Sequence, residues 1–414
     1  MAVLLRERLR GVDREHVRLL GALTGGHFVV HWYQQLFSVI IPTVKGALGL
    51  DDVQVGALST AGTLASGSAG LVSGMLGDRR PSLRPAILAG SIVVMGLGYT
   101  LLGLVPALAW AVAMVLLSGL GSGMWHPTSN ATLAGKFERL RGTVLSVHGT
   151  GATVSDTVTP IVAGALLVWF HWQGVLGVQV VPALVVAWLL LRAIGTSLDA
   201  PDRARAEPHP HPLRDIATLL RHVGVLGMTA ATATMVIGRS VVLTFLPIYL
   251  QEHLGYSPAV MGLYLALLHV LGIVSQPAMG VLSDRYGRKA VLVPSFTMLG
   301  ALYLVLGYVP AGIPLAIVIA LIGLFFYALL NVASAAMFDV VEQRLHASSW
   351  GVSVVLMQVV VLPAPIVAGA LIAPFGIAVP FAIAGALVLL GGLIVALIPM
   401  RRPVASVPPR RPAG

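Results

Sequence analysis

Several histidines and one aspartate lie inside long apolar stretches of this sequence, where ionisable side chains are rare. His27 and His31 are four residues apart, so they would share one face of a helix. Asp156, which follows His126 and His148, is the one carboxylate deep within an apolar run. A charge in apolar surroundings needs a partner or water, and a carboxylate without either takes up a proton. We predict that Asp156, His31 and His148 bind and release protons.

Arg239 is a positive charge at a depth comparable to that of Asp156 within its own apolar run. If the two groups pair, Asp156 stays ionised, whereas an isolated Asp156 can carry a proton. The sequence leaves both arrangements open. At the offset of 205 residues that relates the two halves of the chain, Asp156 corresponds to Val361 and Arg239 to Gln34. The shared scaffold therefore requires neither charge, which favours a functional role for both.

The composition predicts a membrane protein. The 414 residues are 57% hydrophobic and 10% charged, whereas soluble proteins contain about 25% charged residues. Apolar runs of about 20 residues follow one another, and a helix of that length crosses a hydrocarbon core of about 30 Å. We therefore expect an all-α membrane protein with twelve transmembrane helices. The expected spans are residues 19–44, 53–76, 86–105, 107–134, 142–170, 174–194, 223–250, 259–282, 290–309, 314–338, 351–372 and 377–399.

An internal repeat and a polar, proline-containing segment divide these spans into two sets of six. The segment PIVAGALL from Pro160 to Leu167 returns as PIVAGALI from Pro365 to Ile372. Such a repeat predicts two related six-helix bundles. The expected organisation is a cytoplasmic N-terminal segment (1–18), an N-terminal bundle (19–194), a cytoplasmic linker (195–222), a C-terminal bundle (223–399) and a cytoplasmic tail (400–414).

The distribution of basic residues accounts for the net charge of +10. With the N-terminus inside, 24 of the 26 Lys and Arg residues fall on the cytoplasmic side, as the positive-inside rule requires. We expect a multi-pass protein of the cell's inner (plasma) membrane with both termini in the cytoplasm and no nucleic-acid partner. No HExxH, GxSxG or P-loop pattern occurs, so we expect neither enzyme activity nor a cofactor, resident metal or ATP-driven pump.

Two loops between apolar runs repeat one motif, GMLGDRR from Gly74 and GVLSDRYGRK from Gly280. The motif resembles the signature loop of the major facilitator superfamily, found between its second and third and its eighth and ninth helices. The first copy departs from that pattern after Arg80, where Pro81 begins a different sequence. The resemblance implies two rocking bundles gated by these loops, with glycines that allow close helix approach. The expected gating residues are Gly74, Asp78, Arg79, Gly280, Asp284, Arg285 and Arg288.

Within that superfamily, the segments GHFVVHWY (26–33) and GMWHP (123–127) resemble the fosmidomycin-resistance branch, whose members are proton-coupled exporters of small drugs. His31 stands where an acidic residue is expected in that branch. In the superfamily the first, fourth, seventh and tenth helices line a central cavity, and the corresponding spans here carry polar residues at helical spacing. The expected substrate ligands are His27, His31, Gln34, His126, Asn130, Arg239, Tyr327 and Asn331.

These features predict a secondary active transporter that moves a small organic molecule by alternating access coupled to protons, and we favour a drug/proton antiporter acting in efflux. A proton-coupled importer of a metabolite anion is an alternative that uses the same groups, with Arg239 facing the anion. A transition-metal transporter is a further alternative, because His27 and His31 can chelate a metal. We expect a monomer in the lipid bilayer, with a small-molecule substrate and protons as partners. Sequence alone leaves the substrate and the direction of transport undefined.

Overall fold

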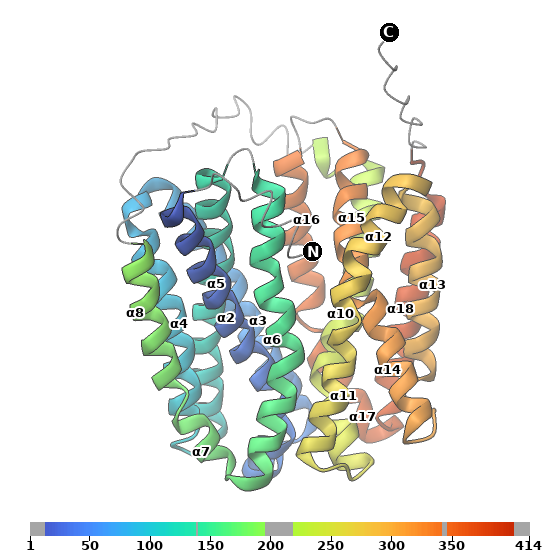
Figure 1. Ribbon diagram of the computed structural model, residues 1–414. Coiled ribbons are helices and arrows are strands. Elements are labelled where there is room, and N and C mark those ends of the chain that lie inside the picture. The colour runs from blue at the N-terminus through green and yellow to red at the C-terminus, as the bar shows by residue number, and fades with distance from the viewer. Residues whose placement is uncertain (1–12, 138–139, 195–217, 342–345, 401–414) are drawn as a thin grey trace.

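The computed structural model describes residues 13–137, 140–194, 218–341 and 346–400, and every regular element in these ranges is a helix (Figure 1). The expected N-terminal segment, linker and tail lie largely outside these ranges. The first group of helices is α2 (Arg14–Leu48), α3 (Asp52–Arg79), the 3-10 helix η1 (Pro81–Leu83), α4 (Arg84–Leu102), α5 (Leu108–Lys136), α6 (Arg141–Trp169), α7 (Trp172–Gly177) and α8 (Val180–Ile194). The second group is α10 (Val223–Ile248), the π-helical turn η3 (Tyr249–His253), α11 (Pro258–Val270), α12 (Gly272–Tyr286), α13 (Arg288–Leu306), α14 (Ile313–Phe326), α15 (Ala328–Asp339), α16 (His346–Val361), α17 (Ala364–Phe375) and α18 (Ala378–Leu397).

Eleven helices in the described ranges are long and apolar enough to cross a membrane. The first expected span, which lies in α2, is not among them, because His27, His31, Gln34 and Gln35 lower its hydropathy. The helix has 35 residues, a length that exceeds the thickness of the hydrocarbon core. The helical fold of a multi-pass membrane protein is thus confirmed, and the count of twelve spans stays a prediction.

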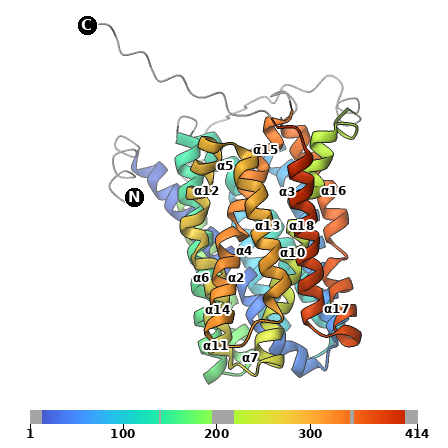
Figure 2. The ribbon, with the colours of Figure 1, turned by 90° about the vertical axis from the view of Figure 1, so that its right-hand side faces the viewer.

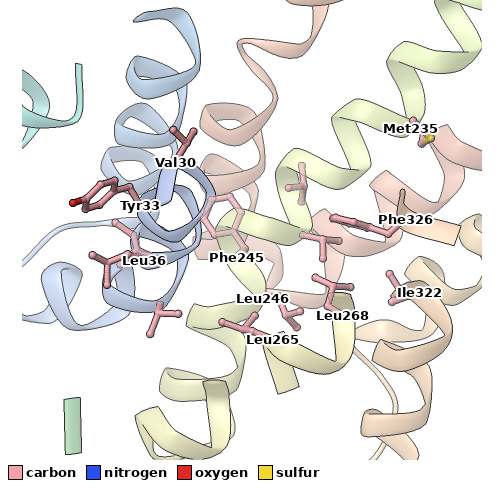
Figure 3. Close-up of a cluster of buried hydrophobic side chains, with 14 of the residues drawn as sticks. Val30, Tyr33, Leu36, Met235, Phe245, Leu246, Leu265, Leu268, Ile322 and Phe326 are labelled. Atoms are coloured by element: carbon pink, nitrogen blue, oxygen red, sulfur yellow. The ribbon is translucent and has the colours of Figure 1, made fainter. Parts of the chain in front are cut away.

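The helices from α2 to α8 and those from α10 to α18 form two groups that stand side by side (Figures 1 and 2). We call them the N-terminal and the C-terminal group. Contacts between them join α6 to α11 and α3 to α17. Buried apolar side chains of both groups form one cluster, in which Val30 and Leu36 of α2 accompany Phe245 of α10, Leu265 of α11 and Phe326 of α14 (Figure 3). This cluster fixes α2 against the C-terminal group.

The repeated PIVAGAL segment supplies the contact between the two groups in both of its copies. Gly164 of the first copy packs against the backbone of Pro258 in α11, and Gly369 of the second packs against the backbone of Asp52 in α3. A Cβ atom at either glycine, or at Gly262 opposite the first copy, would collide with a backbone oxygen of the other group. Only glycine permits this approach. We call the end of the molecule where α2 begins and α18 ends the termini end, and the opposite end the far end (Figure 1). The glycine contacts lie at the far end.

An ionic cluster closes the same far end. Lys45 Nζ of α2 lies 2.7 Å from Asp52 Oδ1 and 2.6 Å from Glu252 Oε2, and Glu252 belongs to the C-terminal group. Burial lowers the pKa of Lys45, but its hydrogen bonds to the two carboxylates outweigh that effect and raise the pKa above the usual range. Lys45 therefore stays protonated at neutral pH. This Lys45 cluster ties the two groups together at one end only.

At the termini end, the ion pairs of the two loop motifs join residues of the same group within the described ranges. Asp78 lies 3.4 Å from Arg84 Nη2. Arg288 contacts Asp284 and donates from Nε to Asp339 Oδ2 at 3.0 Å. The Arg79 side chain is exposed. These carboxylates are thus not engaged between the groups in this conformation.

The expected close helix approach at the motif glycines is found in one copy only. A Cβ at Gly74 would rest against Pro127 of α5 at 3.5 Å, whereas one at Gly280 would meet no atom within 4 Å. The expectation was therefore wrong for Gly280 in this conformation, although Ser283 and Gly287 of the same motif are buried. Arg285 instead stacks over the ring of Tyr286, 5.4 Å from its centre.

Several expected spans are interrupted helices. Span 259–282 consists of α11 and α12, and span 314–338 of α14 and α15, which meet at Tyr327. Span 351–372 similarly contains α16 and α17, which are divided before Pro363. A break exposes backbone groups and turns the local side chains, so breaks at membrane depth occur where protein or a cavity surrounds them. Tyr327 therefore sits at a position that a continuous helix would not provide.

Replacement of Gly262 by alanine is expected to destabilise the protein by about 1–3 kcal/mol, since a methyl group must displace the backbone of α6. Thermal unfolding of the purified protein measures the change. The control is Gly174→Ala, whose added methyl group meets no atom within 4 Å. Equal stability of both variants would contradict the close contact.

Candidate functional site

The site is organised around the carboxylate of Asp156 on α6, which is 2% exposed. Its Oδ1 atom lies 2.8 Å from His31 Nδ1 and accepts a hydrogen bond of 3.0 Å from Gln35 Nε2, both on α2. Its Oδ2 atom accepts a 2.9 Å hydrogen bond from the hydroxyl of Tyr327 in the C-terminal group. A buried charge is tolerated only when it is paired and hydrogen-bonded. One carboxylate thus bonds both groups of helices.

A hydrogen-bonded chain continues from Asp156 into the C-terminal group. The Tyr327 hydroxyl lies 2.8 Å from Nδ1 of His269, which is fully buried on α11. Because the tyrosine proton goes to Asp156, Nδ1 of His269 carries the proton of the second bond. The four residues from His31 through Asp156 and Tyr327 to His269 form what we call the carboxylate network. Proton rearrangement along it would change bonds between the groups.

Arg239 does not pair with Asp156. Within the described residues, its guanidinium lies over the rings of Tyr327 and Phe326, 4.6 Å and 4.9 Å from their centres. The faces of aromatic rings attract cations, so these contacts stabilise the charge. Of the two arrangements that the sequence left open, the structure has the separated one, with the Tyr327 ring carrying Arg239 and its hydroxyl bound to Asp156.

Three imidazoles meet beside the carboxylate network. The ligand nitrogens of His27, His31 and His126 lie within 4.8 Å of one another. Nδ1 of His27 lies 3.0 Å from the backbone oxygen of His148, and the rings of these two residues stack at 4.1 Å. Nitrogen ligands in such a group can hold a transition metal, and they can equally take up a proton. The shared helix face predicted for His27 and His31 is confirmed by their edge-to-face ring contact at 4.8 Å.

A cavity of about 410 Å³ opens next to this region, between the two groups. Gln34 lines it and donates from Nε2 to the Ser122 hydroxyl at 2.8 Å. Gln34 is adjacent in sequence to Gln35, which holds Asp156. The cavity and the carboxylate therefore share one turn of α2. The N-terminal group lines it with Gln34, Phe37, Ser38, Leu58, Ser59, Gly62, Thr63, Ser66, Gly67, Met95, Tyr99, Val115, Ser118, Gly119 and Ser122, and the C-terminal group with Ser240, Leu243, Thr244 and Gln358.

The predicted site residues are divided between several places. Gln34 lines the cavity, and His27, His31, His126 and Tyr327 belong to the carboxylate network or the imidazole group. His148 lies beside them, stacked on His27. Asn130 is exposed on α5, and Asn331 donates to Gln276 Oε1 at 3.1 Å. Neither asparagine lines the cavity.

The expected substrate ligands and proton-binding residues did not include Gln35, His269 or Gln358. Gln35 lies four residues after His31, and helical spacing places both on the polar face of the first span. His269 stands alone on its span in the sequence. The only signal of Gln358 was an amide in an apolar run. Their partners lie in distant segments, so no local pattern could assign their contacts.

Substitution of Tyr327 by phenylalanine is expected to destabilise the fold by about 1–3 kcal/mol, because Asp156 Oδ2 loses its donor while remaining buried. The ring that carries Arg239 is retained. Thermal unfolding measures the effect, with Tyr308→Phe as the control, since Tyr308 is 66% exposed. Unchanged stability of the Tyr327 variant would contradict the bond between the groups.

Comparison with known proteins places these observations in a family. The chain is 28% identical over 302 residues to the proline/betaine transporter of Escherichia coli K12, covering 64% of this chain and 56% of that protein. It is 28% identical over 351 residues to the 3-(3-hydroxy-phenyl)propionate transporter of the same organism, covering 80% of both. It is 23% identical over 319 residues to a probable hexose phosphate transport protein of Chlamydia muridarum, covering 70% of this chain and 69% of that protein.

Solved structures share the fold at low sequence identity. The nucleoside transporter NupG has a TM-score of 0.76 at 13% identity, over 91% of this chain and 99% of that one. A bacterial homologue of the human lysosomal transporter Spinster, in an inward-facing and occupied conformation, has a TM-score of 0.75 at 15% identity, over 93% and 97%. The family model described as Major Facilitator Superfamily matches residues 23–274 and 228–414. The chain therefore belongs to the Major Facilitator Superfamily and is a membrane transporter of small molecules, not an enzyme.

Proposed function

We propose that this transporter couples the movement of a small organic molecule to protons by alternating access, as a drug/proton antiporter that exports its substrate. The observation that carries the proposal is the buried carboxylate of Asp156, whose two oxygens are bonded to different groups of helices. A proton that enters this carboxylate changes a bond on which the relative position of the groups depends. The resemblance of residues 26–33 and 123–127 to fosmidomycin-resistance exporters supports the choice of efflux.

The coupling step is protonation of the pair formed by His31 and Asp156. In the ionised pair, the carboxylate accepts a charge-assisted hydrogen bond from Tyr327, which is stronger than a bond to a neutral acid. Protonation of Asp156 weakens that bond and frees the C-terminal group to move. His148 and the other imidazoles beside His31 serve as the route by which the proton enters or leaves.

Substrate and proton influence one another through α2. Gln34 faces the cavity while Gln35 bonds to Asp156. A substrate that binds the Gln34 amide holds this turn of α2 in place, and with it the Gln35 donor that stabilises the ionised carboxylate. Binding and protonation then oppose each other, which is the requirement for exchange of one for the other.

The two ends of the molecule act as alternating gates. We place the termini end in the cytoplasm, as the positive-inside rule predicts, so that the Lys45 cluster closes the outer side. In the opposite state, Asp78 and Asp284 exchange their partners within one group for contacts across the groups, with Arg79, Arg285 and Arg288 supplying the cations. Each chain contains both groups, so a monomer in the inner membrane, with twelve spans including α2, suffices for transport.

Metal transport is a second candidate function, favoured by the geometry of His27, His31 and His126. Three neutral imidazoles suit a divalent transition metal. Import of a metabolite anion is less well supported, because Arg239 stacks on aromatic rings and does not line the cavity. Proteoliposomes with a pH gradient separate these functions, since proton flux driven by a metal alone would favour metal transport and contradict the organic substrate.

Replacement of Asp156 by asparagine is expected to reduce proton-coupled transport by about tenfold or more, while the protein remains folded. The loss of a charge-assisted hydrogen bond costs about 1.5–3 kcal/mol, and 1.36 kcal/mol corresponds to tenfold in rate. Proton flux into proteoliposomes, recorded with a pH-sensitive dye, measures the change. Asp13→Asn is the matched control, because Asp13 is an exposed helix cap that asparagine can replace. Full proton-driven activity in the Asp156 variant would exclude the proposed role.

Replacement of Lys45 by methionine is expected to shift the protein toward states open at the far end, because Asp52 and Glu252 then repel each other. The chain has no cysteine, so a single cysteine placed at Ser59 reports access by its rate of labelling. We expect labelling from that end to become several-fold faster. Arg192→Met is the control, since Arg192 stacks on Trp188 of its own helix. An unchanged labelling rate in the Lys45 variant would argue against the gate.

A further inference from the structure

We infer that the cavity between the groups binds an electrically neutral molecule that carries several hydroxyl or amide groups and one apolar face. The inference rests on the proposed function, since it specifies the substrate of the same transporter. It departs from the anion that Arg239 suggested in the sequence. The physical basis is the chemistry of the cavity wall, described in the next paragraphs.

Among the residues that the structure describes, those that line the cavity include no Asp, Glu, Lys, Arg or His. Most carry a hydroxyl or an amide, such as Gln34, Ser66, Tyr99 and Gln358. An ion that leaves water for such a site finds no countercharge, and its desolvation is not offset. A neutral molecule with donors and acceptors of its own exchanges its hydrogen bonds with water for similar bonds with these groups.

Neither Arg239 nor Asp156 is among the described residues that line the cavity. Arg239 precedes the lining residue Ser240, yet its guanidinium is held over Tyr327 and Phe326. Asp156 has both oxygens occupied by hydrogen-bond donors. A substrate charge of opposite sign would have to disturb these contacts to reach either group. In the proposed transporter, the carboxylate network binds the proton and the cavity binds the substrate.

The apolar part of the substrate has a defined place as well. Phe37, Leu58, Met95, Val115 and Leu243 contribute to the wall together with the polar residues. A molecule that is polar all round would leave these side chains without apolar contact, and burial of apolar surface is favourable. A volume of about 410 Å³ suits a ligand of nucleoside size.

The polar wall also holds hydrogen bonds between the two groups. Ser59 and Thr244 lie 2.9 Å apart, and Gln358 Nε2 donates to the backbone oxygen of Thr63 at 3.3 Å. Both bonds join residues of different groups that line the cavity. A neutral ligand with hydroxyl or amide groups competes for these partners, so it can loosen the contact that it enters.

The test uses matched pairs of compounds that differ in charge but little in shape. The pairs are pantothenol and pantothenate, and uridine and uridine 5′-monophosphate. The melting temperature of the purified full chain in detergent is measured with each compound. We expect the neutral member of at least one pair to raise Tm by about 2 °C or more, and its charged counterpart to need at least about tenfold higher concentration for the same shift.

Variants assign the response to the cavity. Gln358→Ala is expected to lose the ligand-induced shift, and Gln173→Ala, an exposed glutamine outside the cavity, to keep it. Gln358→Lys, which introduces a cation at the wall, is expected to gain a response to pantothenate. The measurement needs no proton gradient and records ligand binding alone. A failure of proton coupling is thus distinguished from a failure of this inference.

Three results would overturn the inference. The first is a charged member that stabilises the protein as well as its neutral counterpart in every pair that responds. The second is a panel in which no neutral compound raises Tm. A shift that survives in Gln358→Ala and disappears in Gln173→Ala would also contradict it, because the binding site would then lie outside the cavity.

Discussion

The burial of one negative charge constrains much of this structure. Asp156 cannot be ionised in an apolar bundle without donors on every side, and the chain supplies them from α2 and from the break between α14 and α15. This requirement explains why α2 contains a run of polar residues that makes it the least apolar of the expected spans. It also explains why Tyr327 occupies a helix break, where its hydroxyl can reach across to the other group.

The bonds of Asp156 lie between the far end and the termini end of the molecule, and these two ends differ in the contacts between the groups of helices. At the far end, glycines of the repeated PIVAGAL segment bring backbones together, and the Lys45 cluster adds a charged contact. At the termini end, the loop motifs pair within their own groups in the described residues. Among the described residues, ion pairs thus join the two groups at one end and not at the other, which suits a rocking movement about the centre. The centre is where the carboxylate network and the cavity lie.

Repeated and unrepeated residues have different tasks. Gly164 and Gly369 correspond in the two halves, and both serve contacts between the groups. Asp156 and Arg239 have no charged counterparts at the equivalent positions, Val361 and Gln34. The duplicated scaffold thus supports the symmetric movement of the two groups. The polar residues that occur in one half only supply the groups that bind protons and substrate. Neighbouring side chains on α2 serve the two sites separately, since Gln34 lines the cavity and Gln35 donates to the carboxylate of Asp156.

The sequence by itself determined that the chain forms apolar helices in a membrane, that it belongs to the superfamily whose loop motif it carries, and that Asp156 lies deep in the bundle. Hydropathy, short motifs and helical spacing are local properties, so they can be read along the chain. Only the tertiary structure decided that Asp156 binds Tyr327 and not Arg239, that His269 joins the network and that the cavity wall is uncharged. These facts depend on the rotation and meeting of helices far apart in sequence, which side-chain packing sets and no local pattern encodes.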